Sequence, residues 1–253
     1  AEAVARALVA AEADGISSHG LARLPAYAAQ ALSGKVDGQA VPVTTRAAPG
    51  AVHVDAKDGF AFPAIAAGLA AAEEMVRVAG TVGVAIARSH HFGVAGHHLE
   101  PLAERGLVAL AFGNSPAAIA PWGGARALFG TNPIAFARPR EGFAPIVIDL
   151  SLSRVARGKI MVAAQRGEPI PEGWALDADG HPTQDAKAAL QGTMLPMGEA
   201  KGAALVLMVE LLAAALTGSH FGYEASSFFD AAGAPPRVGQ FFLVLDPGRF
   251  AGP

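Results

Sequence analysis

The sequence contains no cysteine among its 253 residues. This absence excludes disulfides, thiolate nucleophiles and zinc–thiolate centres, and it fits the reducing cytoplasm, where we expect the protein to be located. Charged residues are also scarce: they make up 16% of the chain, and the formal net charge is -3. Because there is no basic excess to attract phosphate groups, we expect neither nucleic acid nor a membrane surface as a partner.

The chain also lacks a long apolar segment of the kind that crosses a membrane. Its longest apolar run, residues 202–217, is interrupted by Glu210 and is shorter than the roughly 20 residues that a bilayer requires. We interpret this run as a buried core helix. No secretory signal opens the sequence, and its first residues already have the composition of a helix. With 52% hydrophobic residues, the chain is long enough to bury a substantial core.

Several common enzyme motifs are missing as well. There is no G-x-G-x-x-G after a predicted strand, no H-E-x-x-H and no G-x-S-x-G. Residues 198–202 come nearest to a phosphate-binding loop of the Walker A type, but they lack its spacing and its final Ser or Thr. These absences exclude the usual dinucleotide fingerprint, the P-loop nucleotidases, the zincin proteases and the nucleophile elbow.

What is present is an alternation of helical and extended patterns, which predicts a three-layer α/β body. A connection rich in Pro and Gly over residues 35–50 offers a weak domain boundary, and residues 115–131 form a long loop of the same composition. Helices are predicted over residues 1–13, 23–33, 63–78, 94–105, 155–166 and 201–216. Strands are predicted over residues 51–55, 82–87, 107–112, 133–137, 145–149 and 241–245.

Reactive side chains are most concentrated near the start of the chain, where Ser18, His19 and Arg23 fall within six residues. Histidine exchanges protons near neutral pH, and arginine pairs with carboxylates through two parallel hydrogen bonds. If the chain is helical from Leu21 onward, His19 and Arg23 lie about one turn apart and can face one pocket. The alternative is a simple helix entry, with a serine as the cap and Arg23 in solvent.

Two histidine pairs, His90-His91 and His97-His98, suggest a metal site, but the sequence offers no carboxylate or further histidine at a fixed spacing to complete one. We therefore expect no metal. The first pair lies where a strand passes into a helix, a position at which α/β proteins often bind ligands.

For two further segments, the sequence allows either a purely structural role or a role in ligand binding. Residues 149–153 end a strand before a helix, where Asp149 and Ser151 can cap the helix or bind ribose and phosphate oxygens. Residues 130–133 can form an ordinary turn, or Thr131 can orient a substrate through its hydroxyl group.

Together these segments resemble the type 2 malate/L-lactate dehydrogenase family, which includes sulfolactate, ureidoglycolate and diketogulonate oxidoreductases and the piperideine/pyrroline-2-carboxylate reductases. Order and spacing match from end to end. The motifs that carry the resemblance are Asp14-Gly15 with Ser18-His19-Gly20-Leu21 and Arg23-Leu24-Pro25, Ser89-His90-His91-Phe92-Gly93, Gly113-Asn114-Ser115-Pro116, Ala120-Pro121-Trp122-Gly123-Gly124, Gly130-Thr131-Asn132-Pro133, Ala156-Arg157-Gly158-Lys159 and Lys201-Gly202.

The resemblance implies an α/β fold that is not a Rossmann fold, with a mixed or mostly antiparallel central sheet flanked by helices and a helical N-terminal part. It implies a helical substrate and dimerisation part over residues 1–45 and a cofactor- and substrate-binding body over residues 46–253. It also implies a homodimer, with the active site near the subunit boundary.

The resemblance further implies roles for individual residues. Ser18 orients His19, His19 donates the proton, Arg23 holds the substrate carboxylate, and Thr131 is a further substrate contact. The residues implied to hold the cofactor, NADPH or NADH, are His91, Phe92, Gly93, Val94, Ala95, Asp149, Leu150, Ser151, Ala200 and Lys201.

The chain departs from the family pattern in three respects. It lacks about one helix at its start and the usual C-terminal segment, so we expect it to be truncated at both ends. Glu199 replaces a glycine beside Lys201, where an acid is unfavourable next to a pyrophosphate. Lys159 stands where the cyclic-imine reductases carry an aspartate in their proton relay, which makes Lys159 a candidate catalytic residue and favours the hydroxy-acid branches.

The leading hypothesis is an NAD(P)-dependent oxidoreductase that interconverts a small 2-oxo acid and its 2-hydroxy acid. Hydride moves between the nicotinamide and substrate C2, and His19 supplies the proton. One alternative is a cyclic imino acid reductase that uses the same carboxylate clamp. A second alternative, favoured by the missing ends, is a non-catalytic binding module.

Overall fold

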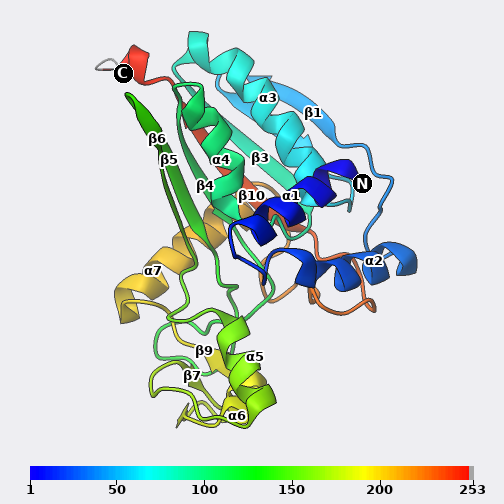
Figure 1. Ribbon diagram of the computed structural model, residues 1–253, viewed down its shortest axis with the longest axis vertical. Coiled ribbons are helices and arrows are strands. Elements are labelled where there is room, and N and C mark those ends of the chain that lie inside the picture. Colours follow the sequence, from blue (N-terminus) through cyan, green and yellow to red (C-terminus); the bar gives the residue numbers. More distant parts are fainter. Residues whose placement is uncertain (251–253) are drawn as a thin grey trace.

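The computed structural model describes residues 1–250, and its centre is a seven-stranded sheet (Figure 1). The strands, in spatial order, are β1 (Val43–Ala48), β2 (Ala51–Asp55), β3 (Thr81–Ser89), β10 (Val238–Leu245), β4 (Val108–Gly113), β5 (Ile134–Arg140) and β6 (Phe143–Leu150). Neighbouring strands are antiparallel throughout, except that β2 and β3 run parallel. The expectation of a mixed, mostly antiparallel sheet is therefore confirmed.

Strand β10 is the last in the sequence but lies at the centre of the sheet, between β3 and β4. Its side chains alternate between the two faces, as in any strand that is covered on both sides. Phe242 and Val244 are fully buried in the main core, whereas Phe241 packs into a second core on the opposite face. The sheet therefore has an apolar cluster on each side.

Helices α3 (Ala61–Ala79) and α4 (Ala95–Glu104) cover one face of the sheet, and α1 (Glu2–Ala13) packs on α3 (Figure 1). Helix α3 is rich in alanine, and its buried residues recur every three or four positions, as expected for a helix with one apolar face. Gly68 lets it approach the sheet closely, because a Cβ atom there would lie 2.8 Å from a methyl group of Val84.

The opposite face is covered by helix only at its centre. Helix α7 (Glu199–Glu210) and the π-helical segment η2 (Leu211–Ala215) pack against β4 and β10. The backbone of β10 comes very close to η2 at Gly239, where any side chain would collide with the Ala213 carbonyl. The predicted three layers are thus present over the middle of the sheet, and all of β1 and most of β6 are exposed.

The chain between β6 and α7 forms a small lobe below the main sheet in Figure 1. This lobe has its own three-stranded sheet, in the order β8-β7-β9. Its elements are α5 (Arg157–Arg166), β7 (Ala175–Leu176), β8 (Pro182–Thr183), α6 (Ala186–Gln191) and β9 (Thr193–Met194).

Helix α2 (Leu24–Ser33) follows a 3-10 turn, η1 (Leu21–Arg23), and lies beside the chain around residues 227–232 (Figure 1). The buried Gln30 donates from Nε2 to the Phe228 carbonyl at 2.7 Å. Lys35, just beyond the helix and only 3% exposed, donates from Nζ to three backbone carbonyls of that segment. These bonds fix α2 to the body of the protein. A last 3-10 turn, η3 (Pro247–Arg249), closes the described chain.

All the predicted helices and strands are present, with ends shifted by a few residues. Helix α6 and the short strands β7, β8 and β9 of the small lobe were not predicted, and two further regions differ from expectation. Residues 35–50 are not only a connection, because they contain β1, an edge strand paired with β2. Every residue of β1 is exposed, so no alternation of apolar and polar residues marks it in the sequence. The helix predicted over residues 201–216 starts earlier and becomes π-helical after Glu210.

Across residues 1–250, none of the helices combines the length and apolar character needed to span a bilayer. Residues 251–253, the end of the predicted body, lie outside the described residues.

Candidate functional site

The loop that carries the predicted catalytic residues is held by Glu12, at the end of α1. Its carboxylate accepts hydrogen bonds from Ser17 Oγ and from the backbone N–H of Leu21, both at 2.9 Å. Gly20 lies against this carboxylate, and a Cβ atom there would collide with it. The glycine is therefore needed for close packing. Glu12 was not among the predicted site residues.

His19 lies at the end of this loop, with Ser18 Oγ 3.0 Å from its Nδ1 atom. Burial, and then the positive charge of Arg23, lower the pKa of His19 to about 4. The imidazole is therefore neutral at pH 7 in the ligand-free chain, and it can accept a proton there but not donate one as imidazolium.

Arg23 is half-buried at the start of α2, and one end of its guanidinium is already bonded. Its Nε atom donates to the Ser18 carbonyl at 2.7 Å, and its Cζ atom lies 4.6 Å from the centre of the Phe229 ring. Its Nη1 atom is buried and has no hydrogen-bond partner among the described residues. A buried donor of this kind is costly unless a ligand satisfies it. The free nitrogen therefore suits an oxygen of a bound carboxylate.

His91 stacks on His19, with ring centres 5.2 Å apart, so the structure brings the first residue of the predicted cofactor-binding set to the predicted proton donor. The Nδ1 atom of His91 lies 2.5 Å from the hydroxyl of Tyr27. Tyr27 was missed in the sequence, although it follows Arg23 by four residues in a predicted helix. That spacing places both side chains on one face.

The remaining histidines of the two pairs have protein partners. His90 Nε2 lies 2.8 Å from Gln30 Oε1, His97 Nε2 lies 2.9 Å from an Asp14 carboxylate oxygen, and His98 Nε2 lies 2.7 Å from the Phe92 carbonyl. Each of these three imidazoles therefore has one ring nitrogen engaged with a protein group. His97 in particular ties the loop after α1 to helix α4.

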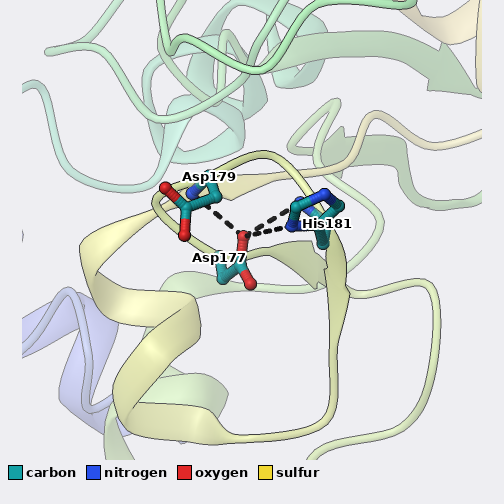
Figure 2. A group of neighbouring side chains, drawn as sticks. All are labelled: Asp177, Asp179 and His181. Atoms are coloured by element: carbon teal, nitrogen blue, oxygen red, sulfur yellow. Dashed lines mark hydrogen bonds and ion pairs between the residues drawn. The ribbon is translucent and has the colours of Figure 1, made fainter.

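Within residues 1–250, one cluster has the composition of a metal site: Asp177, Asp179 and His181 (Figure 2). Asp177 Oδ1 accepts hydrogen bonds from the backbone N–H groups of the other two, at 3.0 and 2.9 Å. The carboxylate therefore already serves as the anchor of its own turn, and two of the three residues are exposed.

The predicted cofactor residues at the start of α4 and at the end of β6 also meet. Asp149 Oδ2 accepts a hydrogen bond from the backbone N–H of Gly96 at 2.8 Å. It thereby satisfies a free N–H group in the first turn of α4. Burial raises the pKa of Asp149, which these backbone bonds partly offset.

Thr131 belongs to a network that is centred on the buried Glu210. The two loops that meet there are joined by Ser115 Oγ, which accepts from the Thr131 N–H at 3.1 Å. Glu210, 1% exposed, accepts from Asn132 Nδ2 at 2.7 Å and from Asn114 Nδ2 at 3.1 Å. Burial raises the pKa of Glu210. This carboxylate, at the start of η2, was interpreted in the sequence only as an interruption of an apolar run.

The start of α7 has the donor chemistry that a cofactor phosphate requires. A cavity of about 510 Å³ is lined by Arg154, Gly198, Glu199, Ala200 and Lys201. Two cations and the free N–H groups of a helix start together favour an anion. Glu199 stands in a left-handed conformation at φ 57°, which is uncommon for a residue with a side chain. Its carboxylate opposes an anion, as expected from the sequence.

Lys159 lies in the first turn of α5, in the small lobe, and is exposed. No hydrogen bond or ion pair links it to His19 or Arg23 in the described part of the chain. The structure does not group it with the other candidates, and its catalytic role stays a prediction.

Comparison with known proteins agrees with these observations. The family profile "Malate/L-lactate dehydrogenase" matches residues 1–253. The chain is 60% identical to the (2R)-3-sulfolactate dehydrogenase (NADP(+)) of Chromohalobacter salexigens, over 99% of this chain and 75% of that protein. It is 48% identical to a Delta(1)-pyrroline-2-carboxylate/Delta(1)-piperideine-2-carboxylate reductase of Pseudomonas putida, with the same coverage.

Solved structures agree as well. The chain matches delta1-piperideine-2-carboxylate reductase from Pseudomonas syringae with a TM-score of 0.90 at 46% identity, over 95% of this chain and 73% of that one. It matches sulfolactate dehydrogenase from Methanocaldococcus jannaschii with a TM-score of 0.91 at 30% identity, over 99% and 72%.

Because several histidines are buried, we expect the stability of the protein to depend on pH. Replacement of His90 measures the contribution of one of them. Burial lowers the pKa of His90 to about 3, whereas an unfolded histidine titrates near about 6.5. At a pH between these two pKa values, His90 is protonated in the unfolded chain but neutral in the folded chain. The free energy of unfolding therefore falls as the pH drops from 6.5 towards 3. We expect His90→Gln, which can keep a donor to Gln30, to flatten this dependence by up to about 1.4 kcal/mol per pH unit.

The measurement is urea unfolding at pH 7, 5.5 and 4.5. His181→Gln is the control, because His181 is exposed and its replacement should leave the slope unchanged. An equal slope in wild type and His90→Gln would contradict the argument.

Proposed function

This chain belongs to the malate/L-lactate dehydrogenase family, and we propose that it acts on a 2-oxo acid with a second anionic group, of the sulfopyruvate type, and prefers NADPH. It is an NAD(P)-dependent oxidoreductase that interconverts a small 2-oxo acid and the matching 2-hydroxy acid. Its similarity to enzymes favours catalysis over the non-catalytic module considered above.

The observation that carries the proposal is the free Nη1 atom of Arg23, a buried cationic donor beside a neutral imidazole. A substrate carboxylate would complete the guanidinium through a bidentate pair. The relative with 60% identity acts on a sulfolactate, and this supports a substrate that carries a second acidic group.

The cofactor would supply the hydride when bound. Among this chain's own residues, Arg23 orients the acid and His19 handles the proton. The negative charge that the substrate brings offsets Arg23 and raises the pKa of His19, so the imidazole gains a proton from solvent on binding. It then transfers this proton to the substrate oxygen as the hydroxy acid forms. In the oxidative direction the neutral His19 accepts the proton.

We assign the cofactor to the remaining predicted residues: His91 to Ala95, Asp149 to Ser151, Ala200 and Lys201. The cavity at the start of α7 supports this assignment, because Lys201 and Arg154 are placed to receive a phosphate. Asp149 already satisfies the start of α4, and its carboxylate would repel a phosphate there. That end of the site therefore suits uncharged parts of the cofactor.

We also propose that the protein is a homodimer. Apolar side chains are exposed on α7 and η2 and along the edge strand β6, and such patches are typical of interfaces. They are Leu205, Leu207, Met208, Leu211, Ile146, Val147, Ile148 and Leu150. The division at residues 45 and 46, like the cytoplasmic location, stays a prediction.

The substrate class is tested with a panel of purified acids and both cofactors. We expect kcat/KM to be highest for sulfopyruvate, lower for oxaloacetate and pyruvate, and at least about tenfold higher with NADPH than with NADH. Preference for piperideine-2-carboxylate would favour the cyclic imino acid reductase, which the 48% identity to such an enzyme keeps as the second candidate. If NADPH fluorescence shows no binding at millimolar concentration, both proposals fail.

The role of His19 is tested by His19→Ala. We expect kcat for oxo acid reduction to fall by about 10²- to 10⁴-fold, because the proton then has no positioned donor, while NADPH still binds. His181→Ala, in the small lobe, should behave as wild type. A kcat for His19→Ala within threefold of wild type would remove this residue from the mechanism.

The carboxylate clamp is tested by Arg23→Ala. We expect KM for the oxo acid to rise about 30-fold or more, the equivalent of about 2 kcal/mol, because the charged hydrogen bonds are lost. Added guanidinium chloride at low concentration should restore part of the affinity. Arg138→Ala, on the exposed end of β5, is the matched control. An unchanged KM in Arg23→Ala would refute the clamp.

A further inference from the structure

The site holds two stacked imidazoles, yet the proposed reaction uses one proton. The ring centres of His19 and His91 are 5.2 Å apart, at an angle of 29° between the planes. A proton that enters with the substrate can therefore settle on either ring. Something must direct it to His19 if His19 is to serve as the donor.

Tyr27 is the group that distinguishes the two rings. Its hydroxyl lies 2.5 Å from His91 Nδ1, and its side chain is 2% exposed. Aromatic rings enclose it, with those of Phe60 and His90 centred 5.3 and 5.5 Å away. In the described structure His91 is the one hydrogen-bond partner of this hydroxyl.

The hydrogens of this pair can be placed by elimination. The phenol carries one hydrogen, and among residues 1–250 the only acceptor that it reaches is His91 Nδ1. Burial raises the pKa of Tyr27, so the phenol keeps its hydrogen. A neutral imidazole whose Nδ1 accepts carries its own hydrogen on Nε2. His91 therefore has a fixed N–H donor at Nε2 and no open lone pair.

A second proton on His91 would have to go to Nδ1, the atom that Tyr27 already occupies. The hydroxyl would then have to turn its hydrogen away into a buried region with no acceptor, which is unfavourable. His19 has no such obstacle, because its Nδ1 neighbour is Ser18, a hydroxyl that can donate or accept.

We propose that Tyr27 is a positioning residue that locks His91 in its neutral Nε2–H form, so that the proton taken up with the substrate goes to His19. This proposal rests on the proposed function for the fate of the proton. It deepens that function by assigning a task to a tyrosine outside the predicted set.

The charges around His91 also disfavour its protonation. Burial first, and then Arg23, His19 and His90, lower the pKa of His91. Near His90, whose pKa is lowered first by burial, Lys35 adds a further positive charge. The ring of Phe228, 5.2 Å from that of His91, is uncharged. Among the described residues, the charged groups that act on His91 include no carboxylate, so we expect an anion to reach the pair of imidazoles with a ligand.

The first test uses the unaltered protein. Nitrogen-15 NMR distinguishes the two imidazole tautomers and the imidazolium. We expect His91 to be in the Nε2–H form from pH 5 to 9, with and without oxalate as a small dianionic probe. We expect oxalate to raise the titration midpoint of His19 alone. A His91 that carries its hydrogen on Nδ1, or that titrates in this range, would overturn the proposal.

The second test replaces the phenol by Tyr27→Phe. Without the donor, His91 Nδ1 regains an open lone pair and competes for the proton, so the apparent pKa of His19 in the complex falls. We expect kcat for reduction at pH 7 to drop about tenfold and to recover at lower pH, with its pH dependence displaced by about one unit. KM, which Arg23 sets, should change by less than about threefold.

The matched control is Tyr223→Phe, because Tyr223 is the only other tyrosine in the sequence and is 58% exposed. It should leave both kcat and the pH profile unchanged. If Tyr27 serves packing alone, Tyr27→Phe will lower kcat equally at every pH and leave the His91 tautomer as it was, and the proposal is then wrong. If the wild type reduces no oxo acid, the proposed function fails, while the NMR test still decides the state of His91.

Discussion

The structure of the site follows from one constraint: the Arg23 guanidinium is half-buried, and within residues 1–250 no carboxylate forms an ion pair with it. A buried charge without a counter-charge is unfavourable, and it disfavours any further positive charge nearby. Burial lowers the pKa of the His19, His90 and His91 imidazoles, and the charge of Arg23 lowers it further, so all three are neutral. A bound substrate anion would offset the positive charge of Arg23 and make it easier for an imidazole to take up a proton. The affinity for the substrate and the uptake of the proton therefore have the same electrostatic cause.

Such a site needs a firm support, because its own charges do not hold it together. The support comes from neighbouring contacts: Glu12 holds the loop, Asp14 ties it to His97, and Lys35 fixes the end of α2. The acidic groups of this region are engaged with backbone N–H groups or with a histidine outside the stacked pair. Negative charge is thereby used for structure at the edge of the site and kept away from Arg23.

Much of the fold and of the candidate site could be predicted from the sequence, and the features that were missed have physical reasons. All helices except the short α6, and most strands, could be predicted from apolar periodicity. Ser18, His19 and Arg23 are close in the chain, so their grouping needs no knowledge of the fold. Strand β1 was missed because an edge strand exposed on both faces has no apolar pattern. Glu210 and the Asn132 loop are 78 residues apart, and only the packing of α7 brings them together. Lys159, by contrast, was chosen by resemblance; it lies in the small lobe, and its catalytic role stays a prediction.

The position of β10 has a consequence for how the protein is made. The strand that joins the two halves of the sheet leaves the ribosome long after β3 and β4 have been synthesised. Until then, those two strands expose unpaired backbone edges and the apolar residues that β10 will cover. Such edges invite pairing with other chains, and contacts between distant segments form slowly. Chaperone binding during synthesis would therefore be most valuable in the interval between the appearance of β4 and that of Leu245.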